Sequence, residues 1–296
     1  MSKRGRFYLG RVVKLGRLNQ TNLIEAINKA TVLTIGKYTW TITDVEQDDA
    51  CEFPFIFGKL AKFSREGHVT VVDSMSKSQV DAIAPNLLVA SSPFVYIPKF
   101  SGIAYLHVWN GIQQDLFVKR FKAIIEATHG NFFVDCTIEP ISDYRSFVAK
   151  LSSLERFIHL QAKVHPPNPL FGRCWKSLNE YLKHRNADEV NISEFKEDGT
   201  GIKTEIVDLV RSLIDDPHYE PLAVPDITDA ALLMAADGYG RGKVVGYEND
   251  SIVTIRTADT QRSFLFPKDP LPTDLAKEAS KHLEKIAKQR NMTHDA

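Results

Sequence analysis

The chain has 296 residues, and its 37 Lys and Arg balance 37 Asp and Glu, so the formal net charge is zero. Hydrophobic residues make up 43% and charged residues 25%, which is typical of a folded globular protein rather than a disordered chain. The charge balance excludes a histone-like polycation but leaves room for a local basic face. Since no apolar run approaches the ~18 residues of a spanning helix and no secretory signal is visible, we expect a cytoplasmic protein.

Residues that commonly hold metals or perform nucleophilic catalysis do not gather in recognisable motifs. The three cysteines, Cys51, Cys136 and Cys174, are too widely spaced for a disulfide framework or a CxxC knuckle. The nine histidines include no H-x-x-x-H zinc pair, and no serine occupies a G-x-S-x-G elbow. The sequence therefore predicts neither a metal site nor a cofactor, and it identifies no catalytic residue.

The first half of the chain is rich in strand patterns. Alternating, β-branched and aromatic residues predict strands at 6–15, 39–45, 53–64, 68–74, 94–100, 102–109 and 131–141. We expect a turn at 65–67 between two of these strands. Apolar residues at helical spacing predict a helix at 22–33, capped by Asn22 or Thr21, and another at 115–128.

A second unit is expected to begin near residue 146. The pattern predicts helices at 143–157, 171–186, 201–214, 230–236 and 274–290, and strands at 157–165, 190–195, 243–247 and 251–257. Three prolines at 165–169 end the first of these strands sharply. Helices and strands are interleaved, but most neighbouring strands look antiparallel. We therefore predict an α+β protein with largely antiparallel sheets, packed helices and two domains, 1–145 and 146–296.

Cationic residues are concentrated at the start of the chain, before the first acid, Glu25; they are Lys3, Arg4, Arg6, Arg11, Lys14 and Arg17. A strand with Arg4, Arg6 and Lys14 on one face could follow a phosphate backbone, because each neutralised phosphate releases a condensed counterion. The alternative is a solvated edge strand whose cations oppose sheet-to-sheet aggregation.

Two further cationic segments have the same two interpretations. Lys119, Arg120 and Lys122 lie together on the helix predicted at 115–128. Arg241 and Lys243 lie in the glycine-rich stretch 238–246, whose backbone amides could cradle an anion, although a flexible turn explains the glycines equally well. The basic stripe on the helix at 274–290 is interpreted as an ordinary solvated face.

One tripeptide has the form of a nuclease motif. Glu194 and Lys196 have the E-x-K spacing of a carboxylate metal ligand and a lysine placed for the nucleophile. The supporting acid would be Asp188 or Glu189 nearby, or Asp135 on an earlier strand. The alternative is an exposed strand end.

The order of elements resembles that of a known group of proteins. An aromatic hairpin at 94–109 precedes a helix at 115–127, a strand at 134–141, the segment 157–169, a polar strand at 190–195 and an amphipathic helix ending at 215–216. This order resembles phage-exclusion and antiviral-defence proteins of the RexA-like and KwaB-like type. The resemblance implies a cytoplasmic DNA-binding protein that forms a homodimer or higher oligomer and works with a membrane protein encoded nearby. It implies no particular site residue.

We therefore predict a non-catalytic DNA-binding protein of a bacterial or prophage antiviral defence system, which contacts the phosphate backbone through a basic face. The residues predicted to form that face are Arg4, Arg6, Arg11, Lys14, Arg17, Lys119, Arg120, Lys122, Arg241 and Lys243. The alternatives are a metal-dependent nuclease centred on Glu194 and Lys196, and a scaffold for an acidic protein. The main prediction requires that cations from distant segments meet on one surface.

Overall fold

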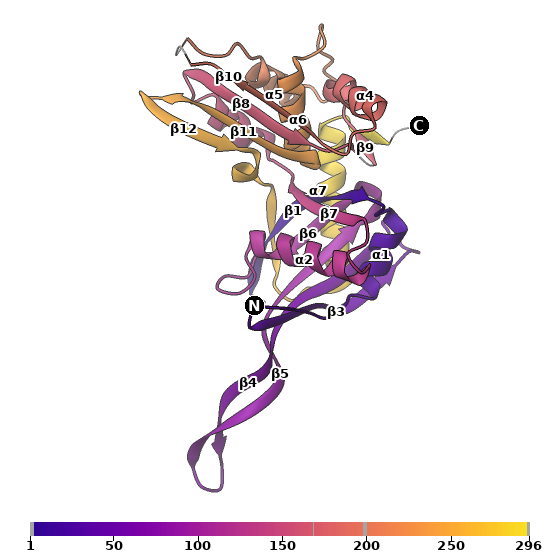
Figure 1. Cartoon of the computed structure of the whole chain (residues 1–296), viewed down its shortest axis with the longest axis vertical. Coiled ribbons are helices and arrows are strands. Elements are labelled where there is room, and N and C mark those ends of the chain that lie inside the picture. Colours follow the sequence, from indigo (N-terminus) through magenta and orange to yellow (C-terminus); the bar gives the residue numbers. More distant parts are fainter. Residues whose placement is uncertain (1–2, 168, 198–199, 295–296) are drawn as a thin grey trace.

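The structure is a computed structural model that describes residues 3–167, 169–197 and 200–294 (Figure 1). In this part of the chain, seven α-helices pack against sheets whose strand pairs are all antiparallel, which confirms the predicted α+β class. None of the helices in these ranges is long and apolar enough to cross a membrane.

The first sheet has eight strands and curls into a half-barrel, with the order β13-β1-β6-β5-β4-β3-β2 and with β7 paired to β1. The strands are β1 (Arg4–Gly16), β2 (Leu33–Ile35), β3 (Tyr38–Asp48), β4 (Phe55–Asp73), β5 (Ser78–Ile97), β6 (Gly102–Leu106), β7 (Val134–Pro140) and β13 (Ser263–Pro267).

Helices cover both faces of this first sheet. Helices α1 (Gln20–Asn28) and α2 (Gln114–Thr128) cover one face, where Phe94 and Tyr96 are buried. Helix α7 (Pro272–Gln289) packs on the other, where Val95 and Ile97 are buried. Because β5 is covered on both sides here, the sequence 94–97 is a continuous apolar run instead of an alternating one.

The second sheet has the order β10-β8-β11-β12, with β8 (Arg156–Val164), β10 (Val190–Phe195), β11 (Gly240–Glu248) and β12 (Ser251–Arg256). Helices α3 (Tyr144–Leu151), α4 (Lys176–Arg185), α5 (Ile206–Asp215) and α6 (Ile227–Met234) belong to this half of the molecule. Helix α6 packs directly on β8, β10 and β11. A short pair, β9 (Leu170–Phe171) with β14 (Thr293–His294), completes the fold.

The chain changes sheets between β7 and β8, close to the boundary predicted at residue 145. Strand pairing does not follow chain order, however, because β13 pairs with β1 and α7 packs on β5 and β6. One buried apolar cluster extends from Phe7 and Leu9 of the first sheet to Leu160 and Val244 of the second. The two-domain division, 1–145 and 146–296, stays a prediction.

Several predicted element bounds are wrong, and the largest errors concern β4 and β5; β5 begins at Ser78, whereas the strand predicted there begins at residue 94. Residues 55–73 form one 19-residue strand, β4, with no turn at 65–67. Gly67 serves close packing instead, because an added Cβ would lie 2.3 Å from the Leu87 Cβ. The first helix is capped by Asn19, whose side chain accepts a hydrogen bond from the backbone N–H of Asn22. The helices predicted at 143–157 and 171–186 are both shorter, since α3 ends at Leu151 and α4 starts at Lys176.

Candidate nucleic-acid interface

The exposed face of the second sheet is cationic. Along β8, Leu160, Ala162 and Val164 are buried, while the alternate residues Gln161 and Lys163 lie on the other face. Strand β11 continues this pattern with Arg241 and Lys243. Alternation along two adjacent strands therefore places a polar, largely cationic surface opposite the buried face.

Strand register places like charges directly opposite one another on this face. Arg241 pairs with Lys163 across β11 and β8, and Lys243 pairs with Arg256 across β11 and β12. Like charges in directly opposite positions destabilise a sheet by a few tenths of a kcal/mol to about 1 kcal/mol. Arg241 and Lys163 are each compensated by an acid, Glu139 and Glu189, so the repulsion that an anion on this face would relieve is that between Lys243 and Arg256.

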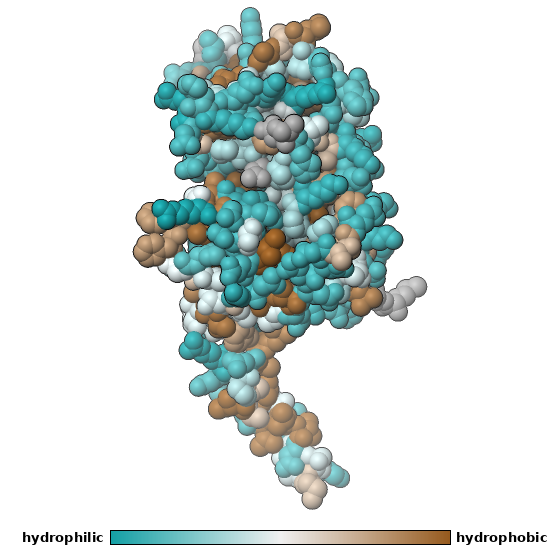
Figure 2. All heavy atoms as spheres, turned by 90° about the vertical axis from the view of Figure 1, so that its right-hand side faces the viewer, coloured by the Kyte–Doolittle hydropathy of each residue, from teal (hydrophilic) through white to brown (hydrophobic). Residues whose placement is uncertain are grey.

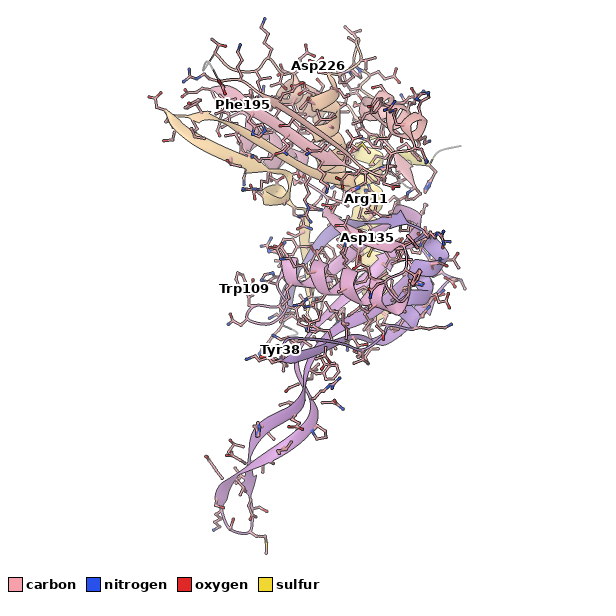
Figure 3. The ribbon with its side chains drawn as sticks, viewed as in Figure 1. Arg11, Tyr38, Trp109, Asp135, Phe195 and Asp226 are labelled. Carbon is pink, nitrogen blue, oxygen red and sulfur yellow. The ribbon has the colours of Figure 1, made fainter. Side chains whose placement is uncertain are left out.

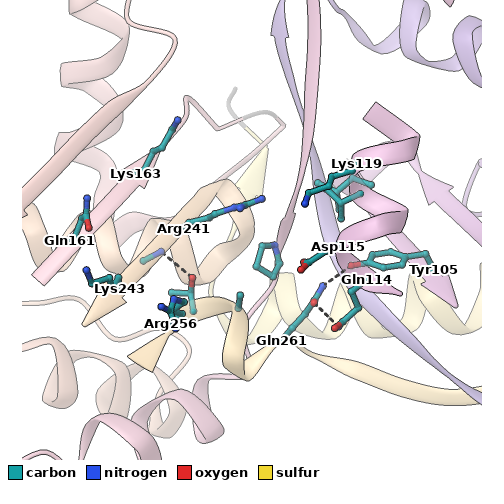
Figure 4. Close-up of a pocket in the computed structure, with 16 residues that line it drawn as sticks. Tyr105, Gln114, Asp115, Lys119, Gln161, Lys163, Arg241, Lys243, Arg256 and Gln261 are labelled. Atoms are coloured by element: carbon teal, nitrogen blue, oxygen red, sulfur yellow. Dashed lines mark hydrogen bonds between the residues drawn. The ribbon is translucent and has the colours of Figure 1, made fainter. Parts of the chain in front are cut away.

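The cationic face of the second sheet forms one wall of a cleft of about 510 Å³. Helix α2, which packs on the first sheet, forms the other wall (Figure 4). Lys119 and Asp115 of α2 line it on that side. We call this the cationic cleft, and its charged and amide-bearing lining residues are Gln114, Asp115, Lys119, Gln161, Lys163, Arg241, Lys243, Arg256 and Gln261. A smaller hollow of about 250 Å³ adjoins it and shares Lys163 and Arg241.

The cations of the cleft differ in how firmly they are held. Arg241 Nε donates to Glu139 Oε2 at 2.9 Å, and the Glu139 carboxylate, which is buried, raises the pKa of Arg241 further. Lys163 Nζ lies 2.6 Å from Glu189 Oε2. Lys119, Lys243 and Arg256 have no ion pair with any described residue. Arg241 is therefore oriented by the protein, while the last three cations are available to a ligand.

Amide side chains form a connected series of hydrogen bonds on the α2 side of the cleft (Figure 4). Gln114 Nε2 donates to Gln261 Oε1 at 3.1 Å, and Gln261 Nε2 donates to the Tyr105 hydroxyl at 3.3 Å (Figure 4). Gln261 also donates to the Leu9 carbonyl at 2.9 Å. This chain of hydrogen bonds connects α2, β6 and the segment before β13, and it fixes these polar groups in the lining of the cleft.

A buried polar network holds the two halves of the molecule in place around the cleft. Asp237 lies in a π-helical turn, Ala235–Tyr239, and accepts hydrogen bonds from Arg290 Nη1 at 2.7 Å, Tyr144 OH at 2.7 Å and Trp175 Nε1 at 2.9 Å. Arg290 and Asp237 are each almost fully buried. Since Arg290 follows α7 and Tyr144 belongs to α3, the network ties the second sheet to the helix that covers the first.

Arg11 belongs to this network and not to a basic face, so that prediction is wrong. Its side chain is 1% exposed, with Nε donating to the Asp237 carbonyl and Nη1 to the Phe100 carbonyl, both at 2.7 Å. The guanidinium also lies over the Tyr239 ring. Figure 3 shows Arg11 at the junction of the two halves. Its carbonyl acceptors make it a structural cation that a phosphate cannot reach.

Of the predicted residues, the structure brings Lys119, Arg241 and Lys243 together in the cleft. Lys122 pairs with Asp135 and Glu126, and the Arg120 guanidinium lies over the Trp40 ring. Both residues of α2 are thereby occupied by the protein. Neither lies in the cationic cleft, although Lys122 lines the smaller hollow beside it.

The remaining N-terminal cations do not converge with the cleft. Lys14 is partly buried and donates to Ser101 Oγ at 2.6 Å, and burial lowers its pKa to about 8. Arg17 is exposed beside the Phe133 ring, and Arg4 and Arg6 are exposed on β1 next to β13. None of these four lines the cationic cleft.

Sequence reasoning missed Lys163 and Arg256, although each left a signal. The alternation of Leu160, Ala162 and Val164 with polar residues marked the exposed face of β8. The Asn249-Asp250 turn, in which both residues have positive φ, joins β11 and β12 as a two-residue hairpin. A two-residue turn at 249–250 pairs Glu248 with Ser251, and the same register places Arg256 opposite Lys243.

The structure does not assemble the nuclease set around Glu194. Glu194 is exposed on β10, beside Phe195, and Figure 3 shows Phe195 well separated from Asp135. The other proposed acid, Glu189, pairs with Lys163. Among the residues that the structure describes, no three His, Cys, Asp or Glu side chains form a group suited to a metal ion.

Comparison with known proteins identifies one family. No curated protein matches the chain in sequence. The model of a domain of unknown function, DUF4747, matches residues 20–214, which is well over half of the chain. The match includes Lys119 and Lys163 of the cleft but ends before β11 and β12. The chain therefore belongs to the DUF4747 family.

Proposed function

We propose that the protein binds the phosphate backbone of DNA in the cationic cleft, without cleaving it. The observation that carries this proposal is the direct pairing of Lys243 with Arg256, neither of which has an acid partner among the described residues, in a cleft that Lys119, Lys163 and Arg241 also line. Phosphates bound there would offset the repulsion between Lys243 and Arg256 and release condensed counterions. The neutral total charge of the chain is compatible with this, because the cations of the cleft outnumber its exposed acid, Asp115.

The size of the cleft favours one strand over a duplex. Its volume of about 510 Å³ is in the range of pockets for small ligands, ~300–1,000 Å³, which is room for one or two nucleotides. Walls from α2 on one side and from β8 and β11 on the other restrict its width. We therefore expect a single-stranded segment to enter the cleft, with phosphates against the sheet and with the amides of Gln114, Gln161 and Gln261 near the sugar or base.

Binding that rests on phosphate contacts should depend on salt and little on sequence. Each phosphate contact contributes about 0.7 to the slope of log affinity against log salt for a single strand. Three to five contacts in the cleft would then give a slope of roughly −2 to −4. Bases stacked on aromatic rings would add affinity without steepening the slope, so a flat salt response would contradict the proposal.

The test is a titration of labelled single-stranded and duplex oligonucleotides at about 50 to 200 mM salt, read by fluorescence anisotropy. The double variant Lys243→Glu/Arg256→Glu should weaken binding at least tenfold, because Arg256 is exposed, Lys243 is half-buried in the lining of the cleft, and neither is paired with a described acid. The matched control is Lys277→Glu/Lys281→Glu on α7, which makes the same charge change on the opposite face of the first sheet. Absence of binding at low salt, or equal weakening by the control, would overturn the proposal.

A scaffold that binds an acidic protein would use the same cations. The anisotropy titration, with poly-glutamate added as a competitor, distinguishes this function from nucleic-acid binding. If poly-glutamate competes with DNA poorly, nucleic acid is the ligand. If poly-glutamate binds and DNA does not, the cleft recognises an acidic protein instead. A role in antiviral defence, a location in the cytoplasm and a membrane partner encoded nearby stay predictions from the resemblance.

A further inference from the structure

Strands β4 and β5 leave the body of the molecule as a long two-stranded ribbon (Figure 1). We call residues 65–86 the arm. Every residue from Val71 to Val80 is exposed, including Met75 at the tip, which is 92% exposed. A lone hairpin is at best marginally stable in water, because two strands cannot bury an apolar face by themselves. We therefore expect the arm to be stabilised by packing against another protein surface.

The two faces of the arm differ in chemistry. Directly paired residues share a face, so register sorts the side chains into two sets. One face, which we call the apolar face, consists of the pairs Gly67–Ala84, Val69–Ala82 and Val71–Val80; the other consists of His68–Ile83, Thr70–Asp81 and Val72–Gln79. Figure 2 shows apolar side chains exposed along the arm. The apolar face is built of small residues with no polar group, as is typical of a sheet face that packs against another sheet.

Opposite charges lie at the two ends of the apolar face. Alternation along β4 places Asp73, at the tip, on the same side as Val69 and Val71, while Arg65, at the base, lines a groove with Phe63 and donates from Nη2 to Thr34 Oγ1 at 3.1 Å. Both side chains are exposed. If the apolar faces of two chains pack together with their arms antiparallel, Arg65 of each chain lies opposite Asp73 of the other. Each apolar pair then lies opposite an apolar pair of the other chain.

The apolar face leads into a groove at the base of the arm. The groove has a volume of about 730 Å³, and Phe63, Arg65 and Leu88 line it together with threonines of β3. Phe63 and Leu88 are a direct pair at the root of the arm, and Leu88 is 59% exposed. The groove offers an apolar pocket where the tip of a second, antiparallel arm would end.

We propose that the arm is the contact of a two-fold symmetric homodimer. The arms of two chains lie antiparallel with their apolar faces together, and Arg65 of each chain pairs with Asp73 of the partner subunit. Met75 of each tip enters the groove at the base of the other arm. The contact is self-complementary, as a two-fold interface must be. This proposal does not depend on nucleic-acid binding, because no residue of the arm lines the cationic cleft.

The dimensions show that the apolar face alone is too small for a standard interface. Eight residue steps separate Arg65 from Asp73, which is about 27 Å of strand. Over that length a two-stranded face about 10 Å wide is small compared with the ~800 Å² per partner of a standard interface. Docking of the tip in the groove enlarges the contact, so face and groove together make the interface.

The first test compares the two faces of the arm. Val71→Lys/Val80→Lys changes the apolar face, and Val72→Lys/Ile83→Lys makes the same change on the opposite face at residues that are at least as exposed. In sedimentation equilibrium at micromolar concentration, the wild type and the second variant should have twice the mass of one chain. The first variant should have a dimer dissociation constant raised at least tenfold. A monomeric wild type, or equal effects of the two variants, would overturn the proposal.

The second test exchanges the end charges. Arg65→Asp alone and Asp73→Arg alone should each raise the dimer dissociation constant, because like charges then meet at both ends. A mixture of the two variants should form a heterodimer, since the two acids of the first variant would face the two arginines of the second. Asp73 also accepts hydrogen bonds from Met75 and Ser76 in the turn. Recovery of dimerisation in the mixture could not come from repair of the turn. Failure of the mixture, when circular dichroism shows the hairpin of each variant unchanged, would exclude the antiparallel pairing.

Discussion

The cations of β1 and those of the second sheet are the same residue types in strands of similar pattern, yet the fold uses them differently. In β1, Arg11 and Lys14 donate to oxygen atoms of the protein, at Asp237, Phe100 and Ser101. In β11 and β12, Lys243 and Arg256 face each other without an acid from the described chain. The first group stabilises the protein, and the second weakens its own sheet.

This difference shows that the role of a cation depends on which acceptors lie next to it in the fold. It does not depend on how many cations lie near it in the sequence. The π-helical turn at Ala235–Tyr239 directs the backbone carbonyl of Asp237 toward β1, so the guanidinium of Arg11 is held by an acceptor of the protein. The exposed face of the second sheet meets the opposite wall of a cleft with one exposed acid, Asp115. Replacing members of each group should therefore affect stability in one case and binding in the other.

The largest expected effect is on stability. Arg11→Met should lower the free energy of unfolding by about 3–5 kcal/mol, because it leaves buried carbonyl groups without donors and breaks a buried charge network. Urea denaturation would measure this loss. Arg17→Met, an exposed cation of the same segment, serves as the control and should stay within about 0.5 kcal/mol of the wild type. A loss below about 1 kcal/mol for Arg11→Met would show that its buried contacts are not structural.

The next effect is a pH dependence that comes from Lys14. Burial lowers the pKa of its ammonium group to about 8, whereas the unfolded value is 10.5. Below pH 8 both states are protonated and the folded protein bears the full cost of the buried charge. Between pH 8 and 10.5 the folded state loses its proton first, so the free energy of unfolding rises with pH, by at most about 3 kcal/mol.

Comparison with Lys14→Met isolates this contribution. The difference in unfolding free energy should shift in favour of the wild type as the pH rises from 8 to 10.5, and stay constant outside that window. Denaturant titrations at a series of pH values would measure it. A constant difference across the window would mean that Lys14 titrates normally.

A smaller pair of opposed effects is expected at Lys243. Lys243→Gln should weaken single-strand binding several-fold and reduce the salt slope by about one contact. The same change removes repulsion with Arg256 and should raise the free energy of unfolding by about 0.5 kcal/mol. Fluorescence anisotropy would measure the affinity and its salt slope, and thermal unfolding would measure the change in stability. Loss of both binding and stability would indicate a structural role and contradict the comparison.

The smallest effect is expected at Arg4. Arg4→Gln should change affinity less than twofold, because this exposed cation lies on β1 beside β13 and outside the cleft. The measurement is the same titration, with Lys243→Gln as reference. Equal weakening by the two variants would show that the N-terminal strand also contacts the ligand.

The sequence determined the local elements well wherever the pattern was regular. Alternation and helical spacing identified β8, β11, β12, α2 and α7, and the antiparallel α+β class followed from them. It failed at residues 53–74, because Gly67 has the chemistry of a turn residue but here makes room for Leu87 inside a long strand. Glycine permits both uses, and the choice depends on a residue twenty positions away.

Only the tertiary structure decided which cations share a surface. Lys119, Lys163 and Lys243 come from three separate segments, and no local pattern states that β8 pairs with β11 or that α2 faces both. Equally, nothing near Arg11 in sequence predicts the carbonyl of Asp237, 226 residues further along the chain. Local pattern fixes the face on which a side chain lies, whereas packing between distant elements fixes what that face meets.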